Sequence, residues 1–383
     1  MKKRIAILGS TGSIGNSLIK IIKEKKNNYQ ILLLTSNKNY KSLFKLADEF
    51  KVKNLIITDK KTYFFVKNQS KYKNYIIHNN FENLNLIFKK KIDYVMSSIS
   101  GIEGLIPTIK IIKHTKKIAI ANKESIICAW DLIKRELKLN NTKFVPVDSE
   151  HYSIWFALNN LSINTINKIY LTASGGPFLN YTNKNLKTVT VKDALNHPNW
   201  SMGDKISIDS ATLMNKVFEI IEAKHMFNIP YNKLGIVIHP NSYIHAIIVF
   251  NNGMIKIIAH DTTMTIPISN SLLENYDYRF RNLDLNFSKF NFEFRKVDLK
   301  KFPIVKILKN LPNYNSLFET ALVSINDNLV ELFLENKISF NKISQKLLKM
   351  IKVRKYSKLK KEKNFSIKEI IKINNQIKSL IKS

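Results

Sequence analysis

Acidic side chains are scarce in this chain, and two groups of them could bind a cation. The sequence contains 29 Asp and Glu residues against 62 Lys and Arg residues. Asp148 and Glu150 are two residues apart, so an extended backbone would direct both to the same side. A helix would place Glu219 on one face with Asn215 and Lys216. Oxygen ligands suit Mg²⁺ or Mn²⁺ better than zinc, although unrelated surface carboxylates remain the alternative for either group alone.

A glycine-rich segment near the N-terminus is typical of a dinucleotide phosphate site. Residues 9–15 read GSTGSIG and lie between an apolar stretch ending at Leu8 and a helix-like stretch over 16–25. Such a turn directs backbone N–H groups and the positive end of a helix toward a pyrophosphate, and the glycines permit a close approach. The spacing is G-x-x-G-x-x-G and not G-x-G-x-x-G, so a chance glycine turn is the alternative.

The end of the second expected strand indicates which nicotinamide cofactor is preferred. Residues 35–39 read TSNKN and contain no carboxylate, which an NAD enzyme usually offers to the ribose hydroxyls. Hydroxyls, amides and Lys38 suit a 2′-phosphate, so NADPH is favoured over NADH. In a chain so rich in lysine, a solvated loop residue is the alternative interpretation of Lys38.

Three further segments offer groups for a phosphate, a lid and a ligand at a sheet edge. Residues 174–177 (SGGP) follow an expected strand, and their N–H groups could bind a phosphate as a backbone nest. Segment 197–203 is interrupted by a proline and carries Trp200 and Met202, which suggests an apolar lid unless it packs in the core. Residues 122–125 (NKES) follow a strand, at the edge where parallel sheets bind ligands.

The elements that must position these groups predict an α/β protein with an N-terminal doubly wound, Rossmann-like parallel sheet. Up to residue 147, short apolar runs alternate with amphipathic stretches of helical length. The expected strands are 5–8, 31–34, 55–57, 94–96, 118–121 and 144–147. We therefore expect residues 1–147 to form the NADPH-binding domain.

The rest of the chain predicts a central α+β catalytic domain and a C-terminal helical domain. The central domain covers 148–290, with a helix near 211–227 and a flexible loop near 197–205. Its expected strands are 169–172, 236–238 and 244–250. Residues 300–383 show only helical patterns, and Ser366 with Glu369 forms a capping box before Ile370, Ile371, Ile377 and Ile381.

The composition limits the class of protein. A formal charge of +33 would by itself suggest a nucleic acid or an anionic membrane as partner, but the lysines are scattered among asparagines and isoleucines. We interpret this as a solvated basic surface typical of AT-biased coding, and expect no specific nucleic acid and no membrane partner. The single cysteine, Cys128, and the lack of a signal, transit or membrane-spanning segment predict a cytoplasmic location.

Seven segments occur in the same order in one enzyme family, and the chain resembles that family over nearly its whole length. The family is 1-deoxy-D-xylulose 5-phosphate reductoisomerase, and the segments are 9–15, 121–125, 146–151, 173–178, 197–203, 205–215 and 238–242. The resemblance implies a metal-dependent rearrangement of 1-deoxy-D-xylulose 5-phosphate to an aldehyde. NADPH then reduces the aldehyde to 2-C-methyl-D-erythritol 4-phosphate for isoprenoid precursors. The resemblance also implies a homodimer that uses the central domain.

The resemblance implies roles for individual residues. Metal ligands would be Asp148, Glu150 and Glu219. The substrate would be bound by Lys123, Ser149, Glu150, Ser174, His197, Trp200, Ser210, Asn215, Lys216 and Glu219. The cofactor would be bound by Thr11, Gly12, Ser13, Ile14, Asn37, Lys38, Asn39, Asn122, Glu124 and Gly203. Catalysis would involve Lys123, Glu150, His151, His197, Glu219 and His245, of which His151 and His245 support the site.

The chain departs from the family pattern at four places, and two other classes of protein share some of its features. The departures are Asn37, Val217, segment 261–267 and segment 324–327. A semialdehyde or homoserine-type dehydrogenase would share the glycine turn, but a semialdehyde dehydrogenase needs a nucleophilic cysteine and Cys128 has no such motif. A basic nucleic-acid-binding protein would explain the charge alone, and salt-resistant binding to DNA would favour it.

Overall fold

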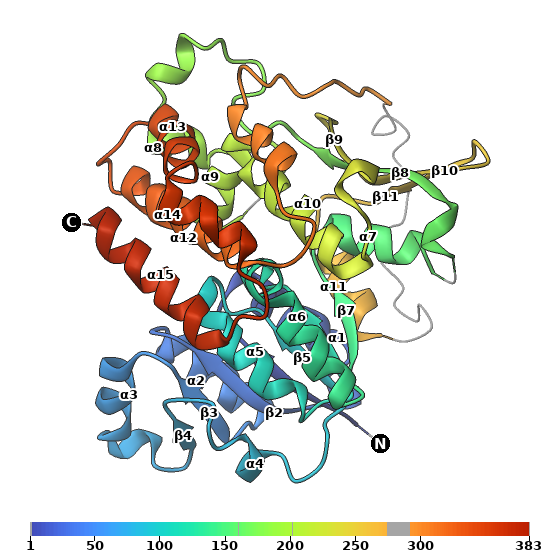
Figure 1. Cartoon of the computed structure of the whole chain (residues 1–383). Helices are drawn as coiled ribbons and strands as arrows, with labels where there is room; N and C mark the ends of the chain where they lie inside the picture. The colour runs from blue at the N-terminus through green and yellow to red at the C-terminus, as the bar shows by residue number, and fades with distance from the viewer. Residues whose placement is uncertain (1, 160, 201, 274–291, 383) are drawn as a thin grey trace. The chain divides into compact units, whose positions relative to one another are not determined.

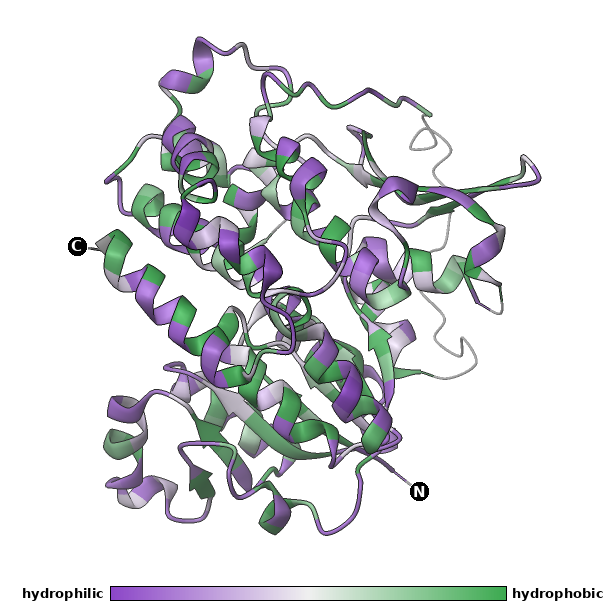
Figure 2. Cartoon of the chain, viewed as in Figure 1, coloured by the Kyte–Doolittle hydropathy of each residue, from purple (hydrophilic) through white to green (hydrophobic). Residues whose placement is uncertain are grey.

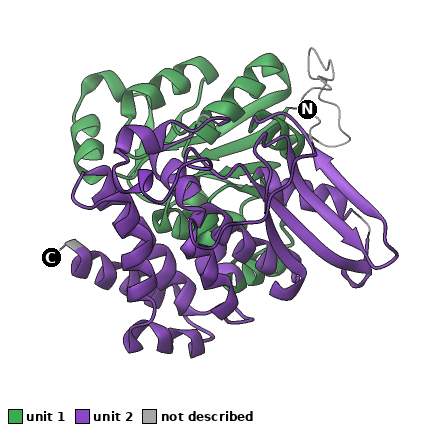
Figure 3. Ribbon diagram, turned by 90° about the horizontal axis from the view of Figure 1, so that it is seen from above, with its two compact units in different colours: residues 1–125, 131–148, 264–281 green, residues 126–130, 149–263, 282–383 purple. Residues whose placement is uncertain are grey.

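The computed structural model describes residues 2–159, 161–200, 202–273 and 292–382 (Figure 1). The chain forms two compact units (Figure 3). Unit 1 comprises residues 1–125, 131–148 and 264–281, and unit 2 comprises 126–130, 149–263 and 282–383. The expected division into 1–147, 148–290 and 300–383 stays a prediction, and its parts at 1, 160, 201, 274–290 and 383 lie outside the described residues. No helix among the described residues is long and apolar enough to cross a membrane.

Unit 1 is built on a seven-stranded parallel sheet in the order β4-β3-β2-β1-β5-β6-β7. The chain winds outward from β1 in one direction through β2 to β4 and then in the other through β5 to β7, as predicted for a doubly wound sheet. The strands are β1 Lys3–Leu8, β2 Tyr29–Ser36, β3 Asn54–Ile57, β4 Ile76–His78, β5 Tyr94–Ser97, β6 Lys117–Ile120 and β7 Lys143–Pro146. The sequence pattern did not predict β4, a three-residue edge strand that is only partly buried.

Amphipathic helices cover this sheet, and one of them comes from a distant part of the chain. The helices are α1 Ser13–Glu24, α2 Tyr40–Phe50, α3 Lys60–Lys67, α4 Leu84–Ile87, α5 Leu105–Ile112, α6 Lys123–Leu139 and α11 Thr265–Leu272. Helix α11 packs beside α1 and buries Ile268 and Leu272 in the core of unit 1. The hydroxyls of Tyr94 and Ser271 lie 2.8 Å apart, which joins β5 to α11. The sequence pattern did not predict this helix, and the spacing of its residues cannot show which core it joins.

Unit 2 contains a four-stranded mixed sheet in the order β11-β10-β8-β9. Strands β8 and β9 run parallel, while β10 runs antiparallel to β8 and to β11. The strands are β8 Ile166–Ala173, β9 Leu234–Ile238, β10 Ile244–Phe250 and β11 Ile255–Ala259, and the helices before and between them are α7 Ser149–Ala157, α8 Val191–Leu195, α9 Asp204–Thr212 and α10 Met214–Phe227. Helices α7 and α10 contact the sheet and bury Ile154 and Ile220 in its core.

The C-terminal part of unit 2 is helical, as predicted. Its helices are α12 Leu317–Leu334, α13 Phe340–Met350, α14 Arg354–Ser357 and α15 Ile367–Lys382. Hydrophilic and hydrophobic residues alternate along α15 (Figure 2). The side chain of Glu369 accepts hydrogen bonds from the backbone N–H and hydroxyl of Ser366, which confirms the predicted capping box. Of the four predicted isoleucines, Ile370 and Ile377 are buried.

Candidate active site

The glycine segment forms a tight turn between β1 and α1. Gly9 has a φ of +81°, which favours glycine. The backbone N–H of Gly9 donates to the hydroxyl of Thr35 at 2.8 Å, which fixes the turn against the end of β2. A Cβ on Gly15 would lie 2.4 Å from the carbonyl oxygen of Gly9, so only glycine fits there. Gly12 precedes α1 and offers no side-chain cap, so the start of this helix can present its N–H groups to an anion.

The residues expected around the ribose lie just after β2. Lys38 is exposed. The amide of Asn37 donates to the hydroxyl of Thr58 at 2.9 Å, so this departure from the family pattern joins the ends of β2 and β3. The side chain of Asn39 accepts from the backbone N–H of Ser42 at 3.2 Å and caps α2. Asn37 and Asn39 therefore shape the loop that carries Lys38.

Asn122 holds the neighbouring edge of the sheet together. Its side-chain oxygen accepts from the backbone N–H of Ser125 at 2.7 Å and caps α6. Its amide nitrogen donates to the carbonyl oxygens of Ile99 and Gly101, which follow β5. Of the expected cofactor residues, all but Gly203 follow β1, β2 or β6 in unit 1. Gly203 belongs to unit 2, where it precedes α9.

The backbone around the first two carboxylates differs from the expectation. Asp148 follows β7, but α7 begins at Ser149, so Glu150 lies in the first turn of a helix and not on an extended segment. The prediction of a shared strand face was therefore wrong, because the local acidic pattern does not reveal a helix start. In unit 1 the Lys123 ammonium binds the Asp148 carboxylate at 3.0 Å. Asp148 is the last residue of the second segment of unit 1, and the chain continues into unit 2 at Ser149.

In unit 2 a buried lysine joins the other two carboxylates. The ammonium of Lys216 lies 2.5 Å from Glu150 Oε1 and 2.6 Å from Glu219 Oε2. The side chains of Lys216 and Glu219 are 6% and 1% exposed, so both charges are almost fully removed from water. Burial by itself would lower the pKa of Lys216, but the two carboxylates outweigh it and raise the pKa above that of ordinary lysine.

Neighbouring side chains hold these carboxylates in place. The amide of Asn215 donates to Glu219 Oε1 at 2.6 Å, and the Ser149 hydroxyl donates to Glu150 Oε2 at 2.5 Å. His151 is fully buried, and its Nε2 lies 2.9 Å from the Glu219 carbonyl oxygen. His151 therefore braces α7 against α10, which agrees with a supporting role.

The expected helix over 211–227 is two helices, because Leu213 has a φ of +61° and separates α9 from α10.

A second cluster in unit 2 gathers three residues expected at the substrate phosphate. His197 Nε2 lies 3.1 Å from the hydroxyls of both Ser174 and Ser210. The Ser174 hydroxyl also accepts from the backbone N–H of Gly176 at 3.0 Å. A Cβ on Gly176 would lie 2.9 Å from Ala211 Cα, so this loop packs directly on α9.

The hydrogen bonds around His197 define its proton position. Its Nδ1 accepts from the backbone N–H groups of Asn199 at 3.2 Å and Trp200 at 3.1 Å. The proton of the neutral ring therefore lies on Nε2, which donates toward the two serine hydroxyls. Burial lowers the pKa of His197 to about 4, so the ring is uncharged at neutral pH.

The segment that carries Trp200 is anchored to the loop after β9. The amide of Asn199 donates to the Pro240 carbonyl oxygen at 2.6 Å and to the Ser242 hydroxyl at 2.8 Å. The ring of Trp200 meets His245 edge to face, with centroids 6.1 Å apart. His245 is 2% exposed and stacks on His260. The buried His245 therefore supports the tryptophan ring through this contact. Residue 201, within the expected lid, lies outside the described residues.

The departure at 324–327 still supports α9. The amide of Asn326 on α12 donates to Asp209 Oδ1 at 2.7 Å. The ammonium of Lys205 lies 2.9 Å from Asp209 and 3.1 Å from Asp327. These bonds hold α9, the helix that carries Ser210, in place. The sequence pattern did not predict this network, because Asn326 and Asp327 lie more than 100 residues from Lys205 and Asp209.

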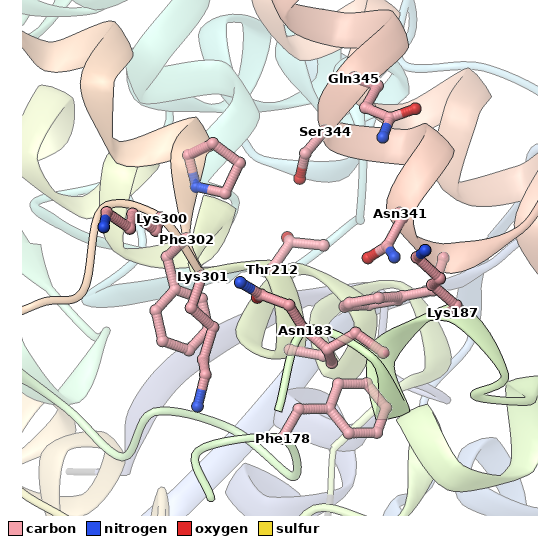
Figure 4. A pocket seen from close by; sticks show the side chains of 14 residues that line it. Phe178, Asn183, Lys187, Thr212, Lys300, Lys301, Phe302, Asn341, Ser344 and Gln345 are labelled. Atoms are coloured by element: carbon pink, nitrogen blue, oxygen red, sulfur yellow. The ribbon is translucent and has the colours of Figure 1, made fainter. Parts of the chain in front are cut away.

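A separate hollow in unit 2 is lined by different side chains (Figure 4). Its volume is about 230 Å³, and its lining includes Phe178, Phe302, Phe340 and Lys187. It reaches α9 at Thr212, but none of the expected site residues lines it. This hollow is therefore not part of the predicted site.

Comparisons with known proteins show to which family the chain belongs. The family model of 1-deoxy-D-xylulose 5-phosphate reductoisomerase matches residues 5–130. Two models of the C-terminal part of this enzyme match the rest: the 1-deoxy-D-xylulose 5-phosphate reductoisomerase C-terminal domain matches 144–227, and the DXP reductoisomerase C-terminal domain matches 261–380. The chain is 54% identical to the enzyme of this name from Pelagibacter ubique (strain HTCC1062), covering 100% of this chain and 99% of the relative. The chain belongs to the 1-deoxy-D-xylulose 5-phosphate reductoisomerase family. A Clostridium kluyveri reductoisomerase is 37% identical over 99% of this chain and 98% of its own length.

Solved structures of reductoisomerases share the fold. A crystal structure of DOX-P reductoisomerase in complex with NADPH, fosmidomycin and magnesium aligns with a TM-score of 0.90 at 32% identity, covering 99% of this chain and 97% of that one. The reductoisomerase from Zymomonas mobilis in complex with NADPH aligns with a TM-score of 0.84 at 29% identity and covers 100% of both chains. The resemblance and the fold class predicted from the sequence are both confirmed.

The buried environment of His197 predicts its titration. We expect a pKa of about 4, against 6.5 for an ordinary histidine, because burial disfavours the charged ring. Its contribution to stability is then complete above pH 6.5 and is lost as the pH falls toward 4. NMR titration of the imidazole nitrogens should follow this, with His197→Asn identifying the resonance. The resonance that is missing from the variant belongs to His197. If this resonance titrates near pH 6.5 in the unmodified protein, the ring is not buried and neutral as described.

Proposed function

We propose that this chain rearranges and reduces 1-deoxy-D-xylulose 5-phosphate to 2-C-methyl-D-erythritol 4-phosphate in the biosynthesis of isoprenoid precursors. The observation that carries the proposal is its membership of the reductoisomerase family over its full length. The chain keeps all three carboxylates and the phosphate-side serines of the family pattern. The protein is therefore an NADPH-dependent oxidoreductase that requires a divalent cation.

NADPH supplies the hydride for the reduction when it is bound. In unit 1 the Gly9 turn and the start of α1 offer backbone N–H groups suited to its pyrophosphate. The exposed ammonium of Lys38 suits the 2′-phosphate, and no carboxylate in 35–39 would repel it. Asn122 keeps the ends of β5 and β6 in place beside this turn.

A bound cation, Mg²⁺ or Mn²⁺, would draw electron density from the substrate's ketone and hydroxyl oxygens. The donor set fits such an ion, because Glu150 and Glu219 offer carboxylate oxygens within 4.8 Å of one another. They already hold one positive charge, that of Lys216. Asp148 would complete the ligand set, as the resemblance to the family implies. Lys123 and Ser149 would contact the reacting end of the substrate.

The serine and histidine cluster suits the substrate's phosphate end. Ser174 and Ser210 present hydroxyls, and the neutral His197 donates from Nε2 beside them. Asn215 and Lys216 follow on α10 and would add an amide and a charge. Trp200, supported by His245, would close over the substrate and exclude water from the reaction.

An exposed apolar surface supports the proposal of a homodimer. Among the described residues, β11 pairs with β10 alone and leaves its other edge open. The side chains of Met254, Ile255 and Ile257 are 66%, 57% and 36% exposed along this edge strand and the turn before it. Contiguous apolar surface at a strand edge favours association with a second copy. A cytoplasmic location agrees with the one cysteine, Cys128, which is buried and cannot form a disulfide within the chain.

The proposed reaction can be measured directly. Purified protein with 1-deoxy-D-xylulose 5-phosphate, Mg²⁺ and NADPH should consume NADPH, followed by its absorbance at the nicotinamide band. With NADH, kcat/KM should be at least roughly tenfold lower. NADH lacks the 2′-phosphate, so Lys38 would lose a charged hydrogen bond of about 1.5 to 3 kcal/mol. Consumption of neither cofactor would overturn the proposal. Equal use of both would overturn the role of Lys38.

The metal assignment predicts a selective loss of activity in Glu219→Gln. We expect kcat/KM to fall by about 100-fold or more, because a neutral amide is a poor ligand and even outer partners of a metal contribute roughly 10- to 100-fold. NADPH affinity, measured by fluorescence, should stay within about twofold because its proposed residues are separate. Glu335→Gln, which removes an exposed carboxylate bound to Lys337, is the control and should stay active. Full activity of Glu219→Gln at limiting Mg²⁺ would disprove the ligand assignment.

The dimer proposal predicts that Ile257→Lys makes the protein monomeric. A charge at the centre of an apolar contact must lose its hydration, so association should weaken. Light scattering after size-exclusion chromatography should report about twice the mass of one chain for the unmodified protein and half of that for the variant. Leu139→Lys on α6 is the matched control, since Leu139 is 73% exposed and lies in unit 1. A monomeric unmodified protein would refute the proposal.

A further inference from the structure

Lys216 carries two roles that it cannot perform at the same time. The family pattern expects its ammonium at the substrate phosphate. In this structure the ammonium instead lies 2.5 Å from Glu150 and 2.6 Å from Glu219, the two carboxylates proposed to bind the cation. An ammonium and a divalent cation repel each other strongly at such distances inside a protein. One of them must leave before the other can occupy the space between the carboxylates.

The burial of this group explains why the lysine is there. Glu150 and Glu219 are 13% and 1% exposed, and removing two negative charges from water without a partner is very unfavourable. A lysine ammonium is a compact charge on a flexible stem, so it can compensate the carboxylates and can also move away. Lys216 stands in the first turn of α10, six residues after Ser210.

We propose that Lys216 is an internal substitute for the metal ion, and that metal binding displaces its ammonium from Glu150 and Glu219 toward the phosphate cluster of Ser174, His197 and Ser210. The inference rests on the proposed metal site and deepens it. The released ammonium then adds the positive charge that the neutral His197 does not supply. Metal binding and phosphate binding are therefore coupled through one side chain, and each strengthens the other by the same factor.

The coupling can be measured without turnover. Calorimetric titration of the complete protein with Mn²⁺, in the absence of NADPH and substrate, gives the metal affinity, and its repetition with inorganic phosphate gives the coupling. In Lys216→Met the competing charge is gone, so Mn²⁺ should bind about tenfold more tightly, within the usual coupling range of roughly 5- to 150-fold. Phosphate should no longer strengthen Mn²⁺ binding.

A matched control separates this effect from the general loss of a lysine. Lys337 binds the carboxylate of Glu335 in the same unit, so Lys337→Met also removes an ammonium held by an acid. Its Mn²⁺ affinity and its response to phosphate should equal those of the unmodified protein. Unchanged or weaker Mn²⁺ binding by folded Lys216→Met would overturn the inference.

Labelling of the unmodified protein tests the displacement without any variant. Lys216 is 5% exposed, so an amine-reactive anhydride should modify it slowly in the metal-free protein. Mn²⁺ should raise its modification severalfold, and added inorganic phosphate should suppress it again, as measured by mass spectrometry of the peptide. Mn²⁺ binding with unchanged labelling of Lys216 would overturn this inference alone. Failure of the unmodified protein to bind Mn²⁺ would overturn the proposed metal site as well.

Discussion

The need to compensate two buried carboxylates is the constraint on which the site in unit 2 depends. Glu150 and Glu219 come from two different helices, and almost no water reaches Glu219. Charges in such surroundings are tolerated only when opposite charges and hydrogen bonds surround them. Lys216, Asn215 and Ser149 provide these partners. The same surroundings give the pair a high affinity for any positive charge, which a protein that must bind a cation can use.

Buried hydrogen bonds keep helices α7, α9 and α10 in place. His151 joins α7 to α10 through the Glu219 carbonyl oxygen, and Asp209 joins α9 to α12 through Asn326. Because these contacts are buried, small movements of the helices would break hydrogen bonds that water cannot replace. The left-handed Leu213 sets the angle between α9 and α10. Ser210 and Lys216 are therefore positioned by rigid elements although a turn separates them.

Unit 1 differs from unit 2, because its expected cofactor residues offer mainly backbone N–H donors and not paired charges. A parallel sheet ends all its strands at one edge, and the loops after β1, β2 and β6 carry the residues expected at the cofactor. Close packing of Gly15 against Gly9 lets α1 begin directly behind the turn. The side chains of Asn37, Asn39 and Asn122 then fix the loops by hydrogen bonds. Lys38 is exposed and is not among the side chains that form these hydrogen bonds.

The sequence by itself determined the elements whose causes are local. The glycine turn, the parallel sheet and the Ser366 capping box follow from hydrophobic periodicity and from residues with special backbone or capping properties. The helix start at Ser149 was missed because its acidic pattern also fits a strand. Only the tertiary structure decided which distant groups meet. Helix α11 packs in the core of unit 1, and Lys216 binds Glu150. The physical reason is that burial and ion pairing depend on neighbours in space, which the spacing of residues along the chain does not specify.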